Sequence, residues 1–199
     1  SRTIVVGNLA DRPDAVRLGS PDEVARTRSA IGLPVDEPVM VGWGTDGWLD
    51  GPDLFVRVLW AAEQRGARVW GLWSGIDPDG PDGRRLVDEA RRCGVADRFV
   101  LRPEISPGAR LCGDVALLSH RSPDGMGTTE DLLLEGVVAG QAVVAFPVLA
   151  LDDPELTVVA PLDVAAAADA VVAALATPRE RRRRRARRRL DIGGVVDEI

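Results

Sequence analysis

The sequence has 199 residues, a mass of 21.3 kDa and a net charge of −6, and it is 45% hydrophobic and 28% charged. These values are typical of one globular domain. All 25 basic residues are arginine, and the chain has no lysine, no tyrosine and a single histidine, His120. The composition therefore excludes a Walker-type lysine, a Schiff-base lysine and a structural zinc site. No apolar run reaches membrane-spanning length, so a cytoplasmic location is expected.

Charge is distributed unevenly along the chain. Residues 179–189 hold nine arginines and one glutamate, so the remainder has a formal charge of −14. The run follows Thr177-Pro178 and contains no glycine or proline, which predicts a helix. One interpretation is contact with an anionic membrane surface, peripheral at the inner face. The alternative is a solvated helix whose arginines pair with the acidic body or with another part of the protein. Nucleic-acid binding is disfavoured because no second basic or aromatic stretch accompanies the run.

Strand and helix signals alternate in chain order. A short apolar run at 3–6 comes first, and Ser20-Pro21-Asp22-Glu23 is a capping box that opens a helix. Further strands are predicted at 38–41, 67–73, 98–101, 115–119, 142–146 and 157–160. Helices are predicted at 20–31, 52–65, 83–93, 106–111, 128–139, 163–176 and 179–189.

This alternation predicts an α/β fold: a Rossmann-like, doubly wound parallel sheet of about six strands with helices on both faces. The expected organisation is a leading linker and helix (1–37), an α/β core (38–176) and an arginine-rich helix and tail (177–199). Ligands bind such sheets at the carboxyl ends of the strands. The candidate site is therefore formed by the loops after the first, second, fourth and fifth strands.

The loop after the first of these strands reads Gly42-Trp43-Gly44-Thr45-Asp46-Gly47, a G-x-G-x-x-G pattern typical of dinucleotide binding. The match is incomplete, because the next helix is delayed to Pro52 and the next strand runs into Ser74-Gly75 rather than an acidic residue. An NAD-dependent oxidoreductase is thus a minor alternative. The other interpretation is a glycine-rich turn that lets a ligand or another domain approach the backbone.

The stretch from Asp114 to Phe146 carries the most information. A buried strand leads to a polar, glycine-rich loop, and a helix begins near Thr128. Backbone amides beside a helix N-terminus form an anion site suited to a phosphate; here they belong to Gly125, Met126 and Gly127. Glu135 lies further along this helix, where a carboxylate either binds the two hydroxyls of a ribose or is simply solvated.

These residues resemble the donor-domain signature of GT-B glycosyltransferases, in particular the large retaining family that includes sucrose and mannosyl transferases. Asp114 to Leu118 match the first part of the signature, and Asp124-Gly125-Met126-Gly127 stand where the family has Glu-Gly-Phe-Gly. The sequence from Leu132 to Gly136 matches the glutamate helix, and Ala139 to Ala145 match its end and the next strand. The resemblance extends more weakly over nearly all of the chain.

The resemblance implies a domain that binds a UDP- or GDP-sugar and belongs to an enzyme transferring a hexosyl group. Asp124 and Glu135 would be the catalytic pair, with Glu135 on the ribose. The implied donor-binding residues are Gly42, Trp43, Gly44, Arg102, Arg121, Gly125, Met126, Gly127 and Thr128. No metal or other cofactor is implied. An acceptor domain is expected before Ser1, and the isolated chain is expected not to catalyse transfer.

Several positions depart from the family pattern. The family places an arginine and a lysine beside the diphosphate where this chain has Trp43 and Asp50. Ten residues rather than seven separate Asp124 from Glu135. Arg121 is either a substitute cation or an exposed loop arginine, and His120 is expected to be a loop residue rather than a base. A catalytically degenerate binding or scaffold module is therefore an alternative.

Overall fold

A parallel sheet of six strands forms the centre of the molecule. The computed structural model describes residues 17–45, 47–121, 135–146 and 156–189. The strand order is β3-β2-β1-β4-β5-β6, and every neighbouring pair runs parallel. The strands are β1 (Val39–Trp43), β2 (Trp70–Ser74), β3 (Phe99–Arg102), β4 (Val115–Leu118), β5 (Ala142–Ala145) and β6 (Leu156–Val158). This order is that of a doubly wound sheet, so the predicted fold class is confirmed. The apolar run at 3–6 lies outside the described residues.

The helices begin at the signals seen in the sequence. Ser20, Ser106 and Asp163 each accept a hydrogen bond from the backbone N–H three residues on, as N-caps do. Residues 135–138 are helical as well, in the described part of the helix predicted at 128–139. The other helices are α2 (Pro21–Ile31), α3 (Pro52–Gln64), α4 (Pro81–Cys93), the 3-10 turn Ala96–Arg98, α5 (Pro107–Leu111), α7 (Val164–Leu175) and α8 (Arg179–Arg189).

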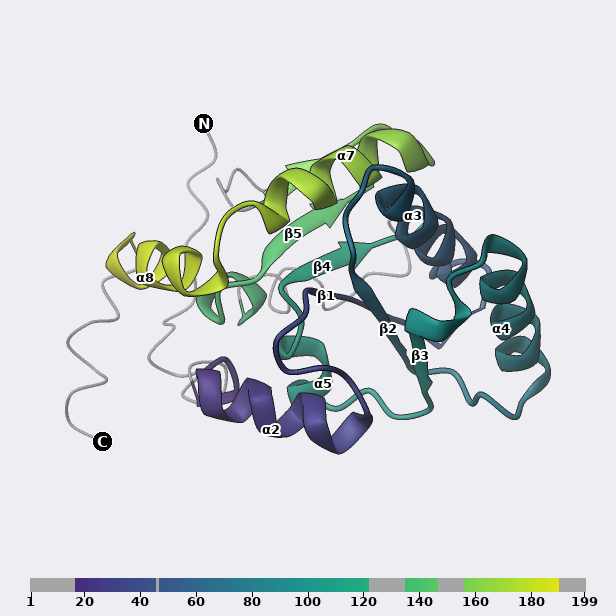
Figure 1. Cartoon of the computed structure of the whole chain (residues 1–199), viewed down its shortest axis with the longest axis horizontal. Helices are drawn as coiled ribbons and strands as arrows, with labels where there is room; N and C mark the ends of the chain where they lie inside the picture. The colour runs from purple at the N-terminus through teal and green to yellow at the C-terminus, as the bar shows by residue number, and fades with distance from the viewer. Residues whose placement is uncertain (1–16, 46, 122–134, 147–155, 190–199) are drawn as a thin grey trace.

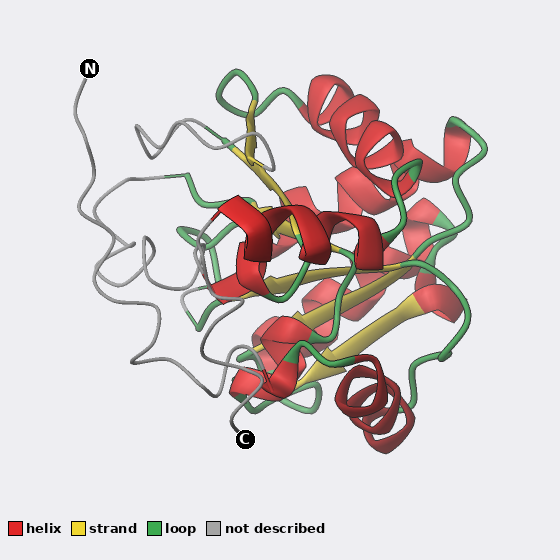
Figure 2. Cartoon of the chain, turned by 90° about the vertical axis from the view of Figure 1, so that its left-hand side faces the viewer, coloured by secondary structure: helices red, strands yellow, loops and turns green. Residues whose placement is uncertain are grey.

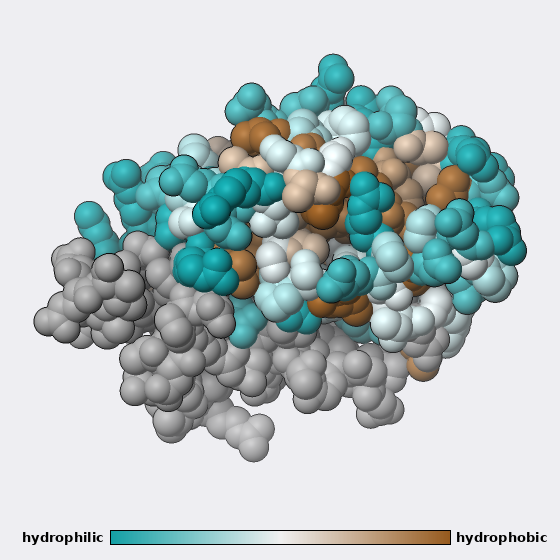
Figure 3. Space-filling model, turned by 90° about the horizontal axis from the view of Figure 1, so that it is seen from below, coloured by the Kyte–Doolittle hydropathy of each residue, from teal (hydrophilic) through white to brown (hydrophobic). Residues whose placement is uncertain are grey.

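Helices cover both faces of the sheet. Helices α3, α4 and α7 lie on one face, and α2 and α5 lie on the other (Figures 1 and 2). Alternate residues of β1 face opposite ways: Met40 packs with the α3 side, whereas Val39 and Val41 pack with the α5 side. The strands β1, β4 and β5 are therefore buried on both faces, which explains their continuous apolar runs. Seen from below, the described surface is largely hydrophilic, with separate apolar patches (Figure 3).

The first strand is longer than the sequence indicated. The glycine at 42 was expected to end the strand, but β1 continues to Trp43. A Cβ at Gly42 would lie 2.7 Å from the Phe55 ring and 2.8 Å from the Trp73 ring, so only glycine fits there. Two aromatic rings cross the strand at this point, which is a packing requirement that glycine in a loop motif does not reveal. The loop therefore begins at Gly44.

Two arginines of α8, the half-buried Arg179 and the buried Arg182, close the edge of the sheet where the strands begin. Helix C-termini meet at this edge, and their last carbonyl groups have no partner within the helix. Arg179 donates to the carbonyl oxygens of Leu111 (2.6 Å), Gly113 (2.5 Å) and Ala139 (3.0 Å). These carbonyls lie at or just beyond the ends of α5 and of helical residues 135–138. Burial lowers the pKa of Arg179 to about 10, so the side chain stays charged at neutral pH.

Arg182 also donates to backbone carbonyl oxygens at this edge of the sheet. Its guanidinium donates to the carbonyl oxygens of Gly140 (2.9 Å), Ala174 (2.8 Å) and Asp114 (2.8 Å), and also to that of Thr177. The side chain is 2% exposed. A planar guanidinium with five donors satisfies several carbonyls at once, and its positive charge complements the negative ends of the helix dipoles.

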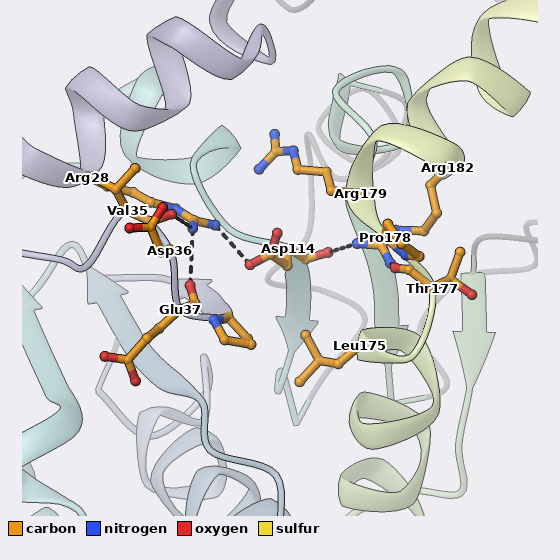
Figure 4. Close-up of a pocket in the computed structure, with 11 residues that line it drawn as sticks. Arg28, Val35, Asp36, Glu37, Asp114, Leu175, Thr177, Pro178, Arg179 and Arg182 are labelled. Atoms are coloured by element: carbon orange, nitrogen blue, oxygen red, sulfur yellow. Dashed lines mark hydrogen bonds and ion pairs between the residues drawn. The ribbon is translucent and has the colours of Figure 1, made fainter.

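A third arginine joins α2 to this edge. Arg28 donates to the carboxylate of Asp114 at 2.8 Å, and Asp114 in turn accepts from the backbone N–H of Val39 at 2.9 Å. Figure 4 shows Arg28 and Arg182 approaching Asp114 from α2 and α8, around a cavity of about 250 Å³. The first and last described helices are thus joined through one residue at the start of β4.

Candidate functional site

The candidate site lies where the strand order reverses, between β1 and β4. The loops after these two strands leave the sheet side by side, at the carboxyl ends where doubly wound folds bind ligands. The backbone N–H of Arg121 donates to the carbonyl oxygen of Leu49 at 2.8 Å. The hydroxyl of Ser119 donates to the carbonyl oxygen of Asp50 at 3.1 Å. The two loops therefore form one connected surface.

Gly51 permits this close approach. A Cβ at Gly51 would lie 2.1 Å from the carbonyl oxygen of Ser119, and Gly51 has φ +70, in the left-handed region. Both requirements select glycine. Gly51 is also the N-cap of α3, so the N-terminus of α3 starts at the point where the two loops meet.

The buried centre of the site is an Asp–His pair. Asp50 is 8% exposed and His120 is 8% exposed, and the His120 Nε2 lies 3.5 Å from the Asp50 Oδ1. Burial lowers the pKa of His120, although the nearby carboxylate of Asp50 acts in the opposite direction. The other ring nitrogen, Nδ1, is buried and has no hydrogen-bond partner among the described residues. The pair places a buried carboxylate, with a histidine beside it, at the carboxyl edge of the sheet.

Asp50 also closes over Gly44. A Cβ at Gly44 would lie 2.3 Å from the Asp50 Oδ2, so the carboxylate rests against the glycine backbone. The N–H of Gly44 donates to the carbonyl oxygen of Ser74 at 3.0 Å, and the indole of Trp73 donates to the carbonyl oxygen of Gly44 at 3.3 Å. Both backbone groups of Gly44 are thus engaged within the protein.

Arg121 is held by the β1 loop. Its guanidinium donates to the carboxylate of Asp53 at 2.7 Å and to the carbonyl oxygen of Trp48, and it lies 5.0 Å from the centroid of the Trp48 ring. The side chain is 12% exposed, so of the two alternatives for Arg121 the exposed loop arginine is wrong. Its charge is balanced by Asp53, so Arg121 positions the loops in this structure.

The remaining predicted site residues differ in their burial and in the element to which they belong. Gly42 and Trp43 are strand residues, and Trp43 is 9% exposed within the apolar cluster on the α5 side. Arg102 ends β3 and donates to the carbonyl oxygen of Ile31 at the end of α2. Glu135 is half-buried in the helix after the β4 loop. The predicted residues Asp124, Gly125, Met126, Gly127 and Thr128 lie outside the described residues, and so do Leu132 to Leu134.

The geometry weighs against the dinucleotide interpretation. In that motif the helix opens within the glycine pattern. Here Gly42 is inside β1, and α3 begins only at Pro52. The strand β2 ends at Ser74, whose hydroxyl donates to the carbonyl oxygen of Glu104, so the last residue of this strand is not the acidic residue that binds a ribose in that motif. Within the described residues, no group of three or more His, Cys, Asp or Glu side chains is placed to hold a metal ion.

Sequence reasoning did not predict the contact between Asp50 and His120. The two residues are 70 positions apart, and the residues around each of them give no sign of the other. A signal was present: both follow strands that were predicted to be parallel. Adjacency of those two strands is set by the strand order, which the sequence pattern leaves open.

No family model matches the chain. It is 31% identical over 162 residues to a D-inositol 3-phosphate glycosyltransferase of Xylanimonas cellulosilytica, and 32% identical over 165 residues to the protein of that name from Mycobacterium avium. The matches cover 78% and 79% of this chain, and 38% of each relative.

Solved structures agree on the fold. A glycosyltransferase from Rickettsia africae superposes with a TM-score of 0.72 at 15% identity, over 92% of this chain and 50% of that one. The Anabaena protein HepE, solved in complex with UDP, superposes with a TM-score of 0.66 at 16% identity, over 92% of this chain and 53% of that one. The chain is a homologue of glycosyltransferases with the GT-B fold. The resemblance to GT-B glycosyltransferases that the sequence of residues 114–146 indicates is therefore confirmed.

The domain spans 38% of the length of these two curated relatives and about half of these two solved structures. In this chain, the edge formed by the β1 and β4 loops carries Asp50, His120 and Arg121 at its centre, with Glu135 on the helix that follows the β4 loop. Among the described residues, no helix combines the length and apolar character needed to cross a membrane.

Proposed function

We propose that this chain is the donor-binding domain of a retaining glycosyltransferase, which transfers a hexosyl group from a UDP- or GDP-sugar to an acceptor. The observation that carries the proposal is the meeting of the β1 and β4 loops at the reversal of strand order, in a chain about one-third identical to glycosyltransferases. HepE, which shares the fold, was solved with UDP and with UDP-glucose. The acceptor side of the reaction belongs to a second domain, and the isolated chain does not transfer sugar.

In this proposal the donor lies along the carboxyl edge of the sheet. The ribose hydroxyls are bound by Glu135, and the sugar and diphosphate are bound by Asp124 and the amides of 125–127. The N-terminus of α3 faces the same edge, and its dipole favours an anion there. Preorganised dipoles that stabilise a leaving diphosphate are an electrostatic mode of catalysis that requires no metal.

Titration calorimetry with UDP, GDP and their glucose and mannose conjugates tests the proposal. Loss of a charged hydrogen bond costs about 1.5–3 kcal/mol, so Glu135→Gln should weaken nucleotide binding by about tenfold to a hundredfold. The matched control is Glu180→Gln on α8, an exposed glutamate near the opposite edge of the sheet. Absence of any nucleotide binding to the wild-type chain and to the longer protein would refute the proposal.

A degenerate module that binds or scaffolds without turnover is the second candidate. The observation in its favour is that Asp50 puts a carboxylate at the carboxyl edge, while Arg121 is already paired with Asp53. Donor hydrolysis by the longer protein separates the two candidates. Measurable release of nucleoside diphosphate excludes the degenerate module.

We also propose that the protein is cytoplasmic and associates with the inner face of the membrane through α8. The exposed side of this helix carries Arg181, Arg184, Arg185 and Arg188, at spacings that form one stripe. Anionic lipid head groups attract such a stripe by about 1 kcal/mol per arginine.

A further inference from the structure

A separate cavity lies beside the candidate site, between the start of α3 and the helix α4. Its volume is about 270 Å³. The indole of Trp48 lines it, although this side chain is 64% exposed and therefore unusually open for a tryptophan. Pro52, Ile76 and Leu86 also line it, and all three are buried. The cavity thus combines a buried apolar floor with an exposed aromatic ring.

The charged residues that line the cavity form ion pairs. Each of its three acidic residues has an arginine partner: Asp53 pairs with Arg121 at 2.7 Å, Asp82 with Arg85 at 3.0 Å, and Glu89 with Arg92 at 2.7 Å and with Arg57 at 3.4 Å. Three arginines and three acidic residues line the cavity, and Arg121 reaches Asp53 from outside the lining. All of these charges form ion pairs within the protein, so a free phosphate or a cation would have to break an existing pair in order to bind. The paired groups nevertheless offer both N–H donors and carboxylate acceptors.

One face of the Trp48 ring is already covered. The guanidinium of Arg121 lies 5.0 Å from the ring centroid, and its bonds to Asp53 and to the Trp48 carbonyl hold it in place. The cation–π contact favours this orientation of the indole. An aromatic ring that is already oriented loses less entropy when a ligand stacks on it.

We propose that this cavity is a binding site for one neutral sugar ring, distinct from the nucleotide-sugar site. A pyranose has an apolar C–H face that stacks on an indole, and peripheral hydroxyls that both donate and accept hydrogen bonds. The cavity supplies a ring for the face and paired charges for the hydroxyls. Its volume is just below the range of about 300–1,000 Å³ found for small-molecule sites, which suits a single ring rather than a nucleotide. The proposal does not depend on the proposed function of the carboxyl edge.

Indole N–H signals in two-dimensional ¹H–¹⁵N NMR spectra of the whole chain test this assignment. The chain has five tryptophans, and Trp60 is the internal control because it is 42% exposed on α3 but does not line the cavity. The probes are methyl α-D-glucopyranoside, methyl α-D-mannopyranoside and uridine. We expect at least one of the two sugars to shift the Trp48 signal saturably in the millimolar range and to leave the Trp60 signal unchanged.

Two variants complete the test. In Trp48→Ala the sugar should no longer shift the methyl signal of Ile76, whereas in Trp60→Ala that shift should persist. Three results would overturn the proposal: no saturable shift with either sugar, equal shifts at Trp48 and Trp60, or a response to uridine alone, which would indicate a nucleobase site. Retention of the Ile76 shift in Trp48→Ala would also overturn it. Failure of UDP to bind in the calorimetric experiment would leave this result unaffected.

Discussion

The carboxylate of Asp50 sets the charge at the carboxyl edge of the sheet. It is buried, rests against Gly44 and pairs with His120. A diphosphate that approaches this edge therefore meets a negative group. Because burial lowers the pKa of His120, the histidine beside it is neutral at neutral pH and does not cancel this charge.

Asp50→Asn should strengthen the binding of UDP to the chain. The amide keeps the shape of the side chain and removes its charge, so we expect about tenfold tighter binding, equivalent to about 1.4 kcal/mol. Titration calorimetry measures the change. The control is Asp169→Asn on α7, an exposed residue paired with Arg65. Unchanged or weaker binding in Asp50→Asn, with the fold intact, would show that the carboxylate does not face the diphosphate.

His120 makes the free energy of unfolding depend on pH. Burial holds its pKa below the ordinary value of 6.5, so in the folded chain it stays neutral to lower pH than in the unfolded chain. Below pH 6.5 the unfolded chain binds more protons at this residue, and the folded state loses stability as the pH falls.

Urea unfolding of the wild type and of His120→Gln, above and below pH 6.5, measures this contribution. The stability advantage of the wild type should shrink as the pH falls, by at most about 1.4 kcal/mol per pH unit. Parallel curves for the two proteins would contradict a lowered pKa.

At the scale of elements, α8 is part of the domain rather than an appended tail. Its buried side packs Ala186 into the apolar cluster on the α5 side, and its arginines bind carbonyl groups at the ends of other helices. One interpretation of the arginine run is that its side chains pair with the acidic body. Arg179 and Arg182 bond backbone carbonyls, which no count of charged residues reveals.

Arg182→Ala should destabilise the domain by about 3 kcal/mol, because it leaves buried carbonyls without a donor. Arg182→Lys should recover little of this loss, since an ammonium group lacks the planar fork. Arg184→Ala, on the exposed side of the same helix, should change stability by less than about 0.5 kcal/mol. Thermal and urea unfolding compare the three variants. Similar effects of Arg182→Ala and Arg184→Ala would mean that α8 does not hold the edge of the sheet.

The sequence predicted elements better than it predicted their contacts. Local signals placed α2, α5 and α7, because Ser20, Ser106 and Asp163 are N-caps whose chemistry acts over three residues. The predicted end of β1 was wrong because Gly42 lies within the strand, where the rings of Phe55 in α3 and Trp73 in β2 leave no room for a side chain. For the same reason, the role of Arg121 could not be read from the sequence: its partner Asp53 lies in the first turn of α3, 68 residues away.

At the scale of the whole molecule, the acidic body of the chain and the basic helix α8 have opposite effects on binding to an anionic membrane. Without residues 179–189 the chain has a charge of −14, which repels an anionic membrane, whereas the exposed stripe of α8 attracts one. Only an orientation that turns α8 toward the lipid allows binding, so association should be weak and sensitive to salt.

Sedimentation with vesicles tests this orientation. The chain should bind vesicles rich in phosphatidylglycerol and not those of phosphatidylcholine, and high salt should release it. The double variant Arg184→Gln/Arg188→Gln should bind several-fold less. The pair Arg68→Gln/Arg91→Gln, which removes equal charge from exposed positions elsewhere, should bind as the wild type does. Equal loss in both double variants would show that net charge, rather than α8, determines binding.

The closure of the strand-start edge by α8 also has a consequence for biosynthesis. A ribosome releases Arg179 and Arg182 only after all six strands have been made, so the nascent chain can form its sheet while the carbonyls of Leu111, Ala139 and Ala174 still face water. The last step of folding is then the docking of an already synthesised helix. A pause that keeps residues 179–189 inside the ribosome after β6 has emerged would hold the nascent domain in an open intermediate, and emergence of these residues would complete it.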